Sequence, residues 1–398
     1  MLKVLSATCS RCVLLSDTFS GRWPSTSIIT LDVYGPMCLK TMRNEAVSDK
    51  ELPLGAREGI NDIVDKINSS GKELSQDTMR QSRRVLRSNR RQLKAFEKKI
   101  LKRWGSALGK LDLLIQVSHE IGMEFNSKHR PAAHSEEDYS FEVLTHLHGR
   151  TCRISREIST LLHGGYASGA LARWRTLHEI AVVAGTIRRH GKELAHKYLL
   201  HVDIEHYRAI IEYQAHRSEL GYDSYTESEV VRAEERMKEL LAEYGREYRG
   251  RYGWASEVLN TSDPSFAQIE EAARLSYLRP YYRLASHDVH AGPIGIRENI
   301  GVPEGSWLSL ILAGPSNMGL ADPGQLTAIS LYQTTAALAT SRHDVEILVA
   351  LSAMDDLMEG TKQEFARIHR QLQKLIESAP SPILYSQPKS LFKWKRGT

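Results

Sequence analysis

Apolar residues recur at helical spacing along most of the chain, and no stretch shows the alternation with period two that is typical of a strand. The helix predicted over residues 161–187 is apolar or small on nearly every side. A helix of that kind is normally buried, so we expect it at the centre of the protein with Trp174 in the core. The whole pattern predicts an all-α fold, an irregular multi-helix bundle with long helices.

Glycines and prolines divide this pattern. Paired glycines such as Gly164 and Gly165 can bend or end a helix, and Gly191 is placed to end the central helix that begins near Tyr166. We expect a polar break around Pro131, before a helix that begins at Ser135. Residues 292–324 hold seven glycines and four prolines, which predicts a long Gly/Pro-rich loop.

Four regions follow from these changes of pattern. Residues 1–42 mix cysteines, hydroxyl residues and hydrophobic residues without a period, and we expect a disordered segment or one that precedes a true translation start at Met42. Residues 43–130 form a basic N-terminal helical region, and residues 135–378 form the helical core domain. The proline-containing residues 379–398 are expected to be a flexible tail.

Composition narrows the class of protein. The chain has 398 residues, a formal net charge of +5 and four cysteines, three of them within the first 38 residues. Without an apolar run of 18 residues, no transmembrane helix is expected, and the cysteines suggest no disulfide framework, so we expect a cytoplasmic protein. A single CxxC pair at Cys9 and Cys12 is weak evidence for a metal. We therefore assign no metal ligands and no cofactor.

Positive charge is concentrated in one predicted helix. Between Arg80 and Arg103 there are eleven lysines and arginines and one acid, Glu97. Two interpretations remain open, because such a helix can bind RNA or another polyanion, or can simply face water. The candidate nucleic-acid-binding residues are Arg83, Arg84, Arg87, Arg90 and Arg91.

Charged side chains also occur in two otherwise apolar helices. The central helix carries Arg175, His178 and Glu179. In the helix predicted over residues 280–291, Arg283, His287 and His290 fall within about 60° of one another and share a face. Because a buried Glu179 needs a cation, we expect the two helices to pack with these faces opposed. Glu179 and Arg175 would then meet Arg283 or His287.

Several motifs occur in order along the chain: residues 165–166 (GY), 169–170 (GA), 173–179 (RWRTLHE), 252–255 (YGWA), 282–287 (YRLASH) with His290, and 314–319 (GPSNMG). Over about residues 104–338 they resemble a bacterial family, the domain of unknown function 5677 family. The resemblance implies a helical bacterial protein without an assigned activity. It supplies no catalytic residues to carry over.

Six residues separate Arg283 from His290. This spacing resembles the Arg-x(4–6)-His pattern of the helical HEPN ribonucleases, named for higher eukaryote and prokaryote nucleotide-binding. The resemblance implies metal-independent RNA cleavage, in which the histidine takes the proton of a 2′-hydroxyl and the arginine stabilises charge on the phosphate. It also implies a homodimer. The chain departs from the pattern at Leu284, where those ribonucleases often have Asn, Asp or His.

Two functions therefore remain open. The first is a HEPN-like endoribonuclease acting in stress or defence, with candidate catalytic residues Arg283, His287, His290, Arg175, His178 and Glu179. The second is a non-catalytic helical module that binds nucleic acid or protein, in which the same charges form a buried structural network. The ribonuclease needs Arg283 and His290 to line an open cleft, whereas the binding module allows both to be enclosed.

Overall fold

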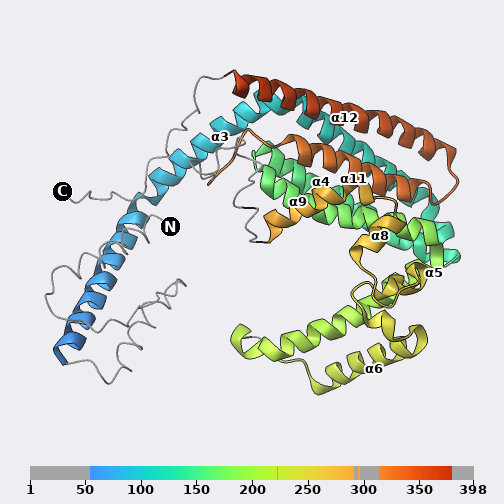
Figure 1. Cartoon of the computed structure of the whole chain (residues 1–398), viewed down its shortest axis with the longest axis horizontal. Coiled ribbons are helices and arrows are strands. Elements are labelled where there is room, and N and C mark those ends of the chain that lie inside the picture. The colour runs from blue at the N-terminus through green and yellow to red at the C-terminus, as the bar shows by residue number, and fades with distance from the viewer. Residues whose placement is uncertain (1–53, 222, 291–294, 296–312, 379–398) are drawn as a thin grey trace. The chain divides into compact units, whose positions relative to one another are not determined.

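The computed structural model describes residues 54–221, 223–290, 295 and 313–378 (Figure 1). Every regular element within these ranges is helical, which confirms the all-α fold class. The expected N-terminal segment 1–42, the tail 379–398 and most of the Gly/Pro-rich loop lie outside the described residues. Within the described ranges, no helix is both long enough and apolar enough to cross a bilayer.

The described residues divide into two compact units, one that ends at Ser88 and one that begins at Asn89. The second unit begins well before residue 135, where the sequence pattern placed the start of the core domain. The principal helices are α3 (Leu54–Ser135), α4 (Tyr139–His163), α5 (Ala167–Leu220), α6 (Glu227–Tyr244), α8 (Phe266–Ala272), α9 (Arg279–Val289), α11 (Ala321–Ala339) and α12 (Val345–Glu377).

Two expected helix boundaries are wrong. Pro131 does not end the helix, because α3 continues through it to Ser135. About one helical turn follows the proline. The next helix, α4, begins at Tyr139 and not at Ser135, and the Asp138 carboxylate caps it by accepting a hydrogen bond from the Phe141 amide at 3.1 Å. Residues 340–344 separate α11 from α12.

Residues 161–187 form the ends of two helices and not one helix, because the chain turns between α4 and α5. Gly165 has a φ of 79°, a conformation that glycine adopts without strain. Its carbonyl accepts a hydrogen bond from the Ser316 amide at 2.8 Å, and an added Cβ would lie 2.8 Å from the Phe96 ring. Gly191, with a φ of 77°, interrupts the helical backbone of α5 as the sequence predicted.

The core of the second unit lies among its long helices. In Figure 1, α4 lies beside α5 and α11, α11 also contacts α12, and α8 and α9 pack on α5. The C-terminal half of α3 contacts α12, since the Ser106 hydroxyl donates to Glu364 at 2.5 Å and Lys110 donates to the Gly360 carbonyl at 3.3 Å. One continuous hydrophobic cluster joins all of these helices.

Trp174 lies at the centre of this cluster, as predicted. Its side chain is fully buried. Its indole Nε1 donates hydrogen bonds to the Leu326 carbonyl and the Ser330 hydroxyl, each at 3.0 Å. The ring therefore fills the space between α5 and α11 and also satisfies two polar atoms of α11.

A second buried contact joins α3, α4 and α11 through His148. Its Nε2 lies 3.2 Å from the Ser118 hydroxyl and 3.3 Å from the Thr335 hydroxyl. Burial, together with the nearby charge of His119, lowers the pKa of His148 to about 4. The imidazole is therefore neutral in the folded protein at pH values where it would be charged in the unfolded chain.

We expect Trp174→Ala to destabilise the protein by about 3–5 kcal/mol, because it leaves a cavity and removes the indole donor. Val202→Ala is a matched control on the same helix, since Val202 is exposed and should change stability by less than about 0.5 kcal/mol. Urea titrations measure both changes. A loss below about 1 kcal/mol for Trp174→Ala would contradict the central position of this residue.

His148 should make stability depend on pH. The unfolded chain binds a proton below pH 6.5, whereas the folded protein does not until about pH 4, so stability falls as the pH is lowered between these values, by about 3 kcal/mol in total. His148→Gln should remove this part of the loss, and His146→Gln, which replaces an exposed histidine of the same helix, should not. Urea titrations at pH 7.5 and 4.5 compare the variants. Equal losses in the parent and in His148→Gln would contradict the assignment.

Candidate functional site

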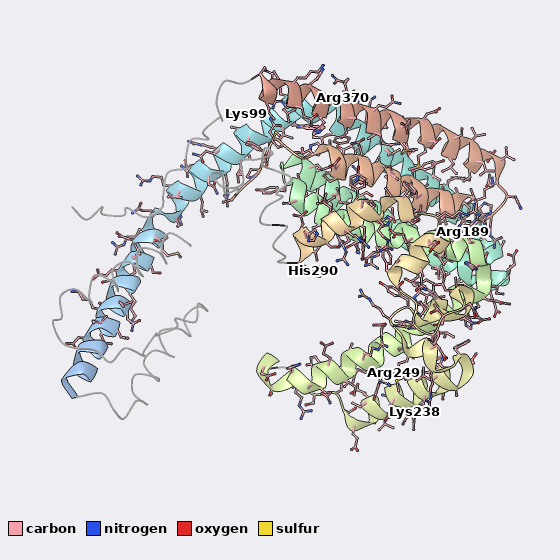
Figure 2. The ribbon with its side chains drawn as sticks, viewed as in Figure 1. Lys99, Arg189, Lys238, Arg249, His290 and Arg370 are labelled. Atoms are coloured by element: carbon pink, nitrogen blue, oxygen red, sulfur yellow. The ribbon has the colours of Figure 1, made fainter. Side chains whose placement is uncertain are left out.

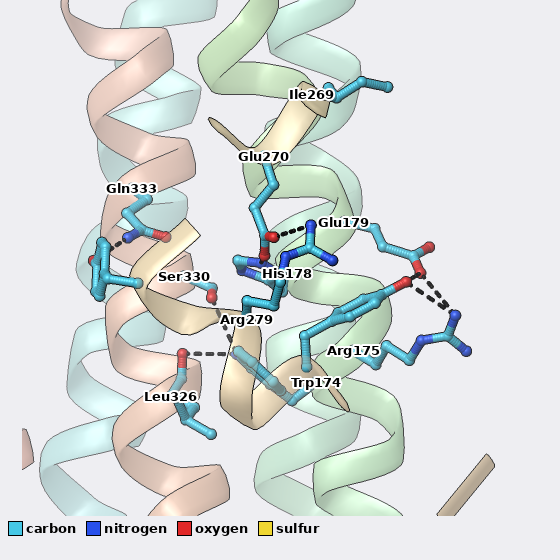
Figure 3. A network of polar contacts seen from close by, with 12 residues as sticks. Trp174, Arg175, His178, Glu179, Ile269, Glu270, Arg279, Leu326, Ser330 and Gln333 are labelled. Carbon is cyan, nitrogen blue, oxygen red and sulfur yellow. Dashed lines mark hydrogen bonds and ion pairs between the residues drawn. The ribbon is translucent and has the colours of Figure 1, made fainter. Parts of the chain in front are cut away.

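Glu270 of α8 is a fully buried carboxylate that contacts two other helices (Figure 3). Its Oε1 lies 2.6 Å from Nε2 of His178 on α5, and its Oε2 forms an ion pair with Nη2 of Arg279 at the start of α9. Because a carboxylate only accepts hydrogen bonds, the His178 Nε2 carries the proton and donates it. One carboxylate therefore joins α5, α8 and α9.

The contacts of Glu270 make its burial energetically acceptable. A buried charge is costly unless it is paired and hydrogen-bonded, and here Arg279 balances the charge while His178 donates to the other oxygen. The His178 ring is fully buried and stacks on Trp174, with ring centroids 5.2 Å apart. The network is therefore continuous with the hydrophobic core, and His178 has no access to solvent.

A second polar cluster lies beside this network, where Tyr282 of α9 faces α5. The Tyr282 hydroxyl donates to Glu179 at 2.5 Å and accepts from Arg175 Nη2 at 2.9 Å. The same guanidinium lies 3.5 Å from Glu179, and its Cζ lies 4.8 Å from the centroid of the Tyr282 ring. Burial and the hydrogen bond to Glu179 raise the pKa of Tyr282, so its hydroxyl stays protonated and remains a donor.

Solvent reaches this second cluster. The side chains of Arg175 and Glu179 are 22% and 33% exposed. Phe266 packs on Tyr282 with ring centroids 4.8 Å apart, and Tyr252 lies 6.2 Å from Phe266, so aromatic rings border the cluster on one side. The Arg175 guanidinium and the Glu179 carboxylate can thus contact a polar ligand from solvent. His178 and Glu270 cannot, because both are fully buried.

The expected pairing of Glu179 with Arg283 or His287 is wrong. Helices α5 and α9 do pack together, but within the described part of the chain the partners of Glu179 are Tyr282 and Arg175. Successive residues of a helix project about 100° apart. Because Tyr282 faces α5, Arg283 is turned to the solvent and is exposed.

The expected face shared by Arg283, His287 and His290 is also wrong. Helix α9 ends at Val289, and His290 has an extended backbone with φ −104° and ψ 139°. Its amide closes the last turn on the Ser286 carbonyl at 2.9 Å, but its side chain no longer follows the helical register. Figure 2 shows His290 at this end of α9. His290 is exposed and His287 is half-buried, so these residues are not a buried network.

The residue pattern did not identify Glu270, Arg279 or Tyr282 as site residues. Glu270 is followed by Glu271, and only the helical register of α8 decides that the first is buried and the second exposed. That register depends on a capping box between Ser265 and Gln268, in which each side chain bonds the other residue's backbone amide. The one available signal was His178, an unmatched polar side chain in an apolar helix.

The five arginines proposed for nucleic-acid binding are all exposed on α3. Arg83, Arg84 and Arg87 belong to the first compact unit, and Arg90 and Arg91 to the second. In the second unit they are followed by further exposed lysines, among them Lys99 in Figure 2. The structure therefore places all five side chains where a ligand could reach them.

Residues 141–306 match the model of a family described as a family of unknown function, DUF5677. This segment, which is less than half of the chain, is similar to that family. No curated protein matches the chain, and no solved structure matches it.

The recognition of DUF5677 from the sequence motifs is thus confirmed, over a narrower range than residues 104–338. Three motifs of the DUF5677 segment meet at the half-buried cluster around Tyr282, since they supply Glu179, Tyr252 and Tyr282. The motif at residues 314–319 lies beyond the match and has a structural contact, because Trp104 Nε1 donates to the Asn317 carbonyl at 3.2 Å. Among the described residues, no group of three or more His, Cys, Asp or Glu side chains is placed to hold a metal ion.

Removing the Glu270 charge should destabilise the protein by about 3 kcal/mol, because Glu270→Gln leaves Arg279 without its partner in a largely buried position. Glu271→Gln is the matched control, with an expected change below about 0.5 kcal/mol at an exposed position. Both changes are measured by urea titration at neutral pH. If the two variants lose the same small amount, the Glu270 network does not hold the helices together.

Proposed function

We propose that this protein is a non-catalytic helical protein that binds nucleic acid through the basic surface of α3. The observation that carries the proposal is the charge of residues 89–103, which hold seven lysines and arginines and one acid, Glu97. All seven cationic side chains are exposed, and none forms an ion pair with another described residue. This surface thus carries positive charge that the described fold does not neutralise.

The spacing of these charges suits a phosphate backbone. Fifteen helical residues span about 22 Å, so seven cations give about one charge per 3 Å, close to the spacing of about 3.4 Å per phosphate along one nucleic-acid strand. Arg90, Arg91, Lys94, Lys98 and Lys102 fall within about 120° of the helix circumference. Like charges at such spacing repel one another, and a bound polyanion would relieve the repulsion.

The contacts of the candidate catalytic residues favour binding over cleavage. His178 is fully buried and donates to Glu270. Arg175 and Glu179 are engaged by the Tyr282 hydroxyl. Three of the six candidates therefore have structural partners, as expected for a non-catalytic module with an internal polar network.

Replacing Arg83, Arg84, Arg87, Arg90 and Arg91 with Gln should weaken binding of single-stranded RNA and make it less dependent on salt. Each phosphate contact contributes about 0.7 to the slope of log K against log salt concentration, so the magnitude of the slope should fall by up to about 3.5. Fluorescence anisotropy at several salt concentrations measures it, with single-stranded DNA as a second ligand.

A variant with the same net charge serves as the control. It replaces five exposed arginines outside α3, namely Arg189, Arg217, Arg246, Arg249 and Arg370, with Gln. This control should keep the parent slope. Equal slopes for both variants would show that only the net charge matters, and a parent protein that binds neither RNA nor DNA at low salt would exclude the proposal.

The second candidate is a HEPN-like, metal-independent ribonuclease acting as a homodimer. It is favoured by one observation, the exposure of Arg283 and His290, since neither is enclosed in the buried network. On this proposal the parent protein cleaves RNA in the presence of EDTA, and His290→Ala abolishes cleavage while its melting temperature stays unchanged. Intact RNA after prolonged incubation with the parent protein would exclude cleavage, and cleavage by His290→Ala would exclude this residue.

A further inference from the structure

A pocket of about 370 Å³ opens between α3 and α4, and it shares no residue with the sites described above. Its lining includes Gln116 and His119 from α3 and Gly149, Cys152, Arg153 and Arg156 from α4, together with the apolar Ile115. Two arginines and a histidine thus line one space, and its lining holds no carboxylate. The sequence did not indicate this grouping, because its two halves lie more than 30 residues apart.

The two arginines retain charge for a ligand. Arg156 Nη1 lies 3.7 Å from Asp112, a long ion pair, and Asp112 already accepts hydrogen bonds from Ser159 at 2.6 Å and His163 at 3.0 Å. Arg153 Nε lies 3.8 Å from Glu157. The side chains are 49% and 69% exposed, so these weak pairs leave both guanidinium groups accessible.

One of these guanidinium groups is held in place. Arg156 Nη2 donates to the Gln116 side-chain carbonyl at 3.2 Å, and the Gln116 amide in turn donates to Glu120 at 2.8 Å. A guanidinium fixed in this way loses less entropy when it binds an oxyanion with two parallel hydrogen bonds. Part of the ordering that a ligand would require is therefore already present.

The pocket is open at Gly149, which is exposed, and its lining holds no negative charge. An added Cβ at Gly149 would meet no atom within 4 Å, and glycine in the middle of a helix costs about 0.5–1 kcal/mol relative to alanine. Nothing in the described fold requires this glycine. The Cys152 thiol is almost completely buried, and burial raises its pKa, so at neutral pH it is uncharged and does not repel an anion.

We propose that this pocket binds a small organic phosphomonoester, with Arg153 and Arg156 holding the phosphate and His119 beside them. Guanidinium groups match the geometry of phosphate oxygens. The volume lies within the range of about 300–1,000 Å³ of small-ligand sites. The proposal does not depend on nucleic-acid binding by α3.

Calorimetry with ribose 5-phosphate tests the proposal on the full chain. We expect saturable binding of one molecule per chain, at least tenfold weaker binding by Arg153→Gln/Arg156→Gln, and unchanged binding by Arg150→Gln, which alters an exposed arginine of the same helix outside the pocket lining. Ribose, which lacks the phosphate, should not bind. Absence of binding at millimolar concentration, or equal binding by the double variant, would overturn the proposal.

Competition by sulfate gives an independent reading. Sulfate at equal ionic strength should not displace ribose 5-phosphate in the calorimetric titration, and equal displacement by sulfate would overturn selectivity for a phosphomonoester. Gly149→Leu should fill the pocket and abolish binding, with an unchanged melting temperature as evidence of folding. Full binding by a folded Gly149→Leu variant would overturn the location.

Discussion

The carboxylate of Glu270 is buried without access to water, and the packing of three helices depends on how it is satisfied. Its two partners come from elsewhere in the chain: His178 on α5 donates a hydrogen bond, and Arg279 at the start of α9 forms an ion pair. If either helix shifted, a charge would remain buried without a partner, at a cost of several kcal/mol. The network therefore specifies how α8 and α9 pack on α5. The His178 ring stacks on Trp174, so the network also contacts the hydrophobic core.

The burial of the Glu270 network divides the polar side chains into a group that stabilises the fold and a group that a ligand can reach. The buried network leaves His178 and Glu270 unable to meet a ligand, while Tyr282 on the next turn of α9 places Arg175 and Glu179 at the surface. We therefore propose binding at groups that the core does not use, above all the exposed cations of α3 and of the pocket between α3 and α4. The fold holds these groups in place, and their chemistry is independent of the Glu270 network.

Periodicity and glycine geometry were sufficient to predict much of the fold from the sequence. The all-α class, the burial of Trp174 and the break at Gly191 depend on local patterns, and the structure confirms them. The helix break predicted at Pro131 was wrong, because a proline near the end of a helix need not end that helix. The partners of the buried charges could not be predicted, since Glu270 and Glu271 differ only by the register of α8. A change of one position likewise decided that Tyr282 and not Arg283 meets Glu179.

A double-mutant cycle between Glu270 and Arg279 tests most directly whether this buried pair holds the helices together. Glu270→Gln, Arg279→Met and the double variant are compared with the parent protein by urea titration at neutral pH. A direct contact predicts that the two changes are not additive, with a coupling energy of about 1–3 kcal/mol. A coupling energy of zero within error would contradict the contact and the organising role given to Glu270.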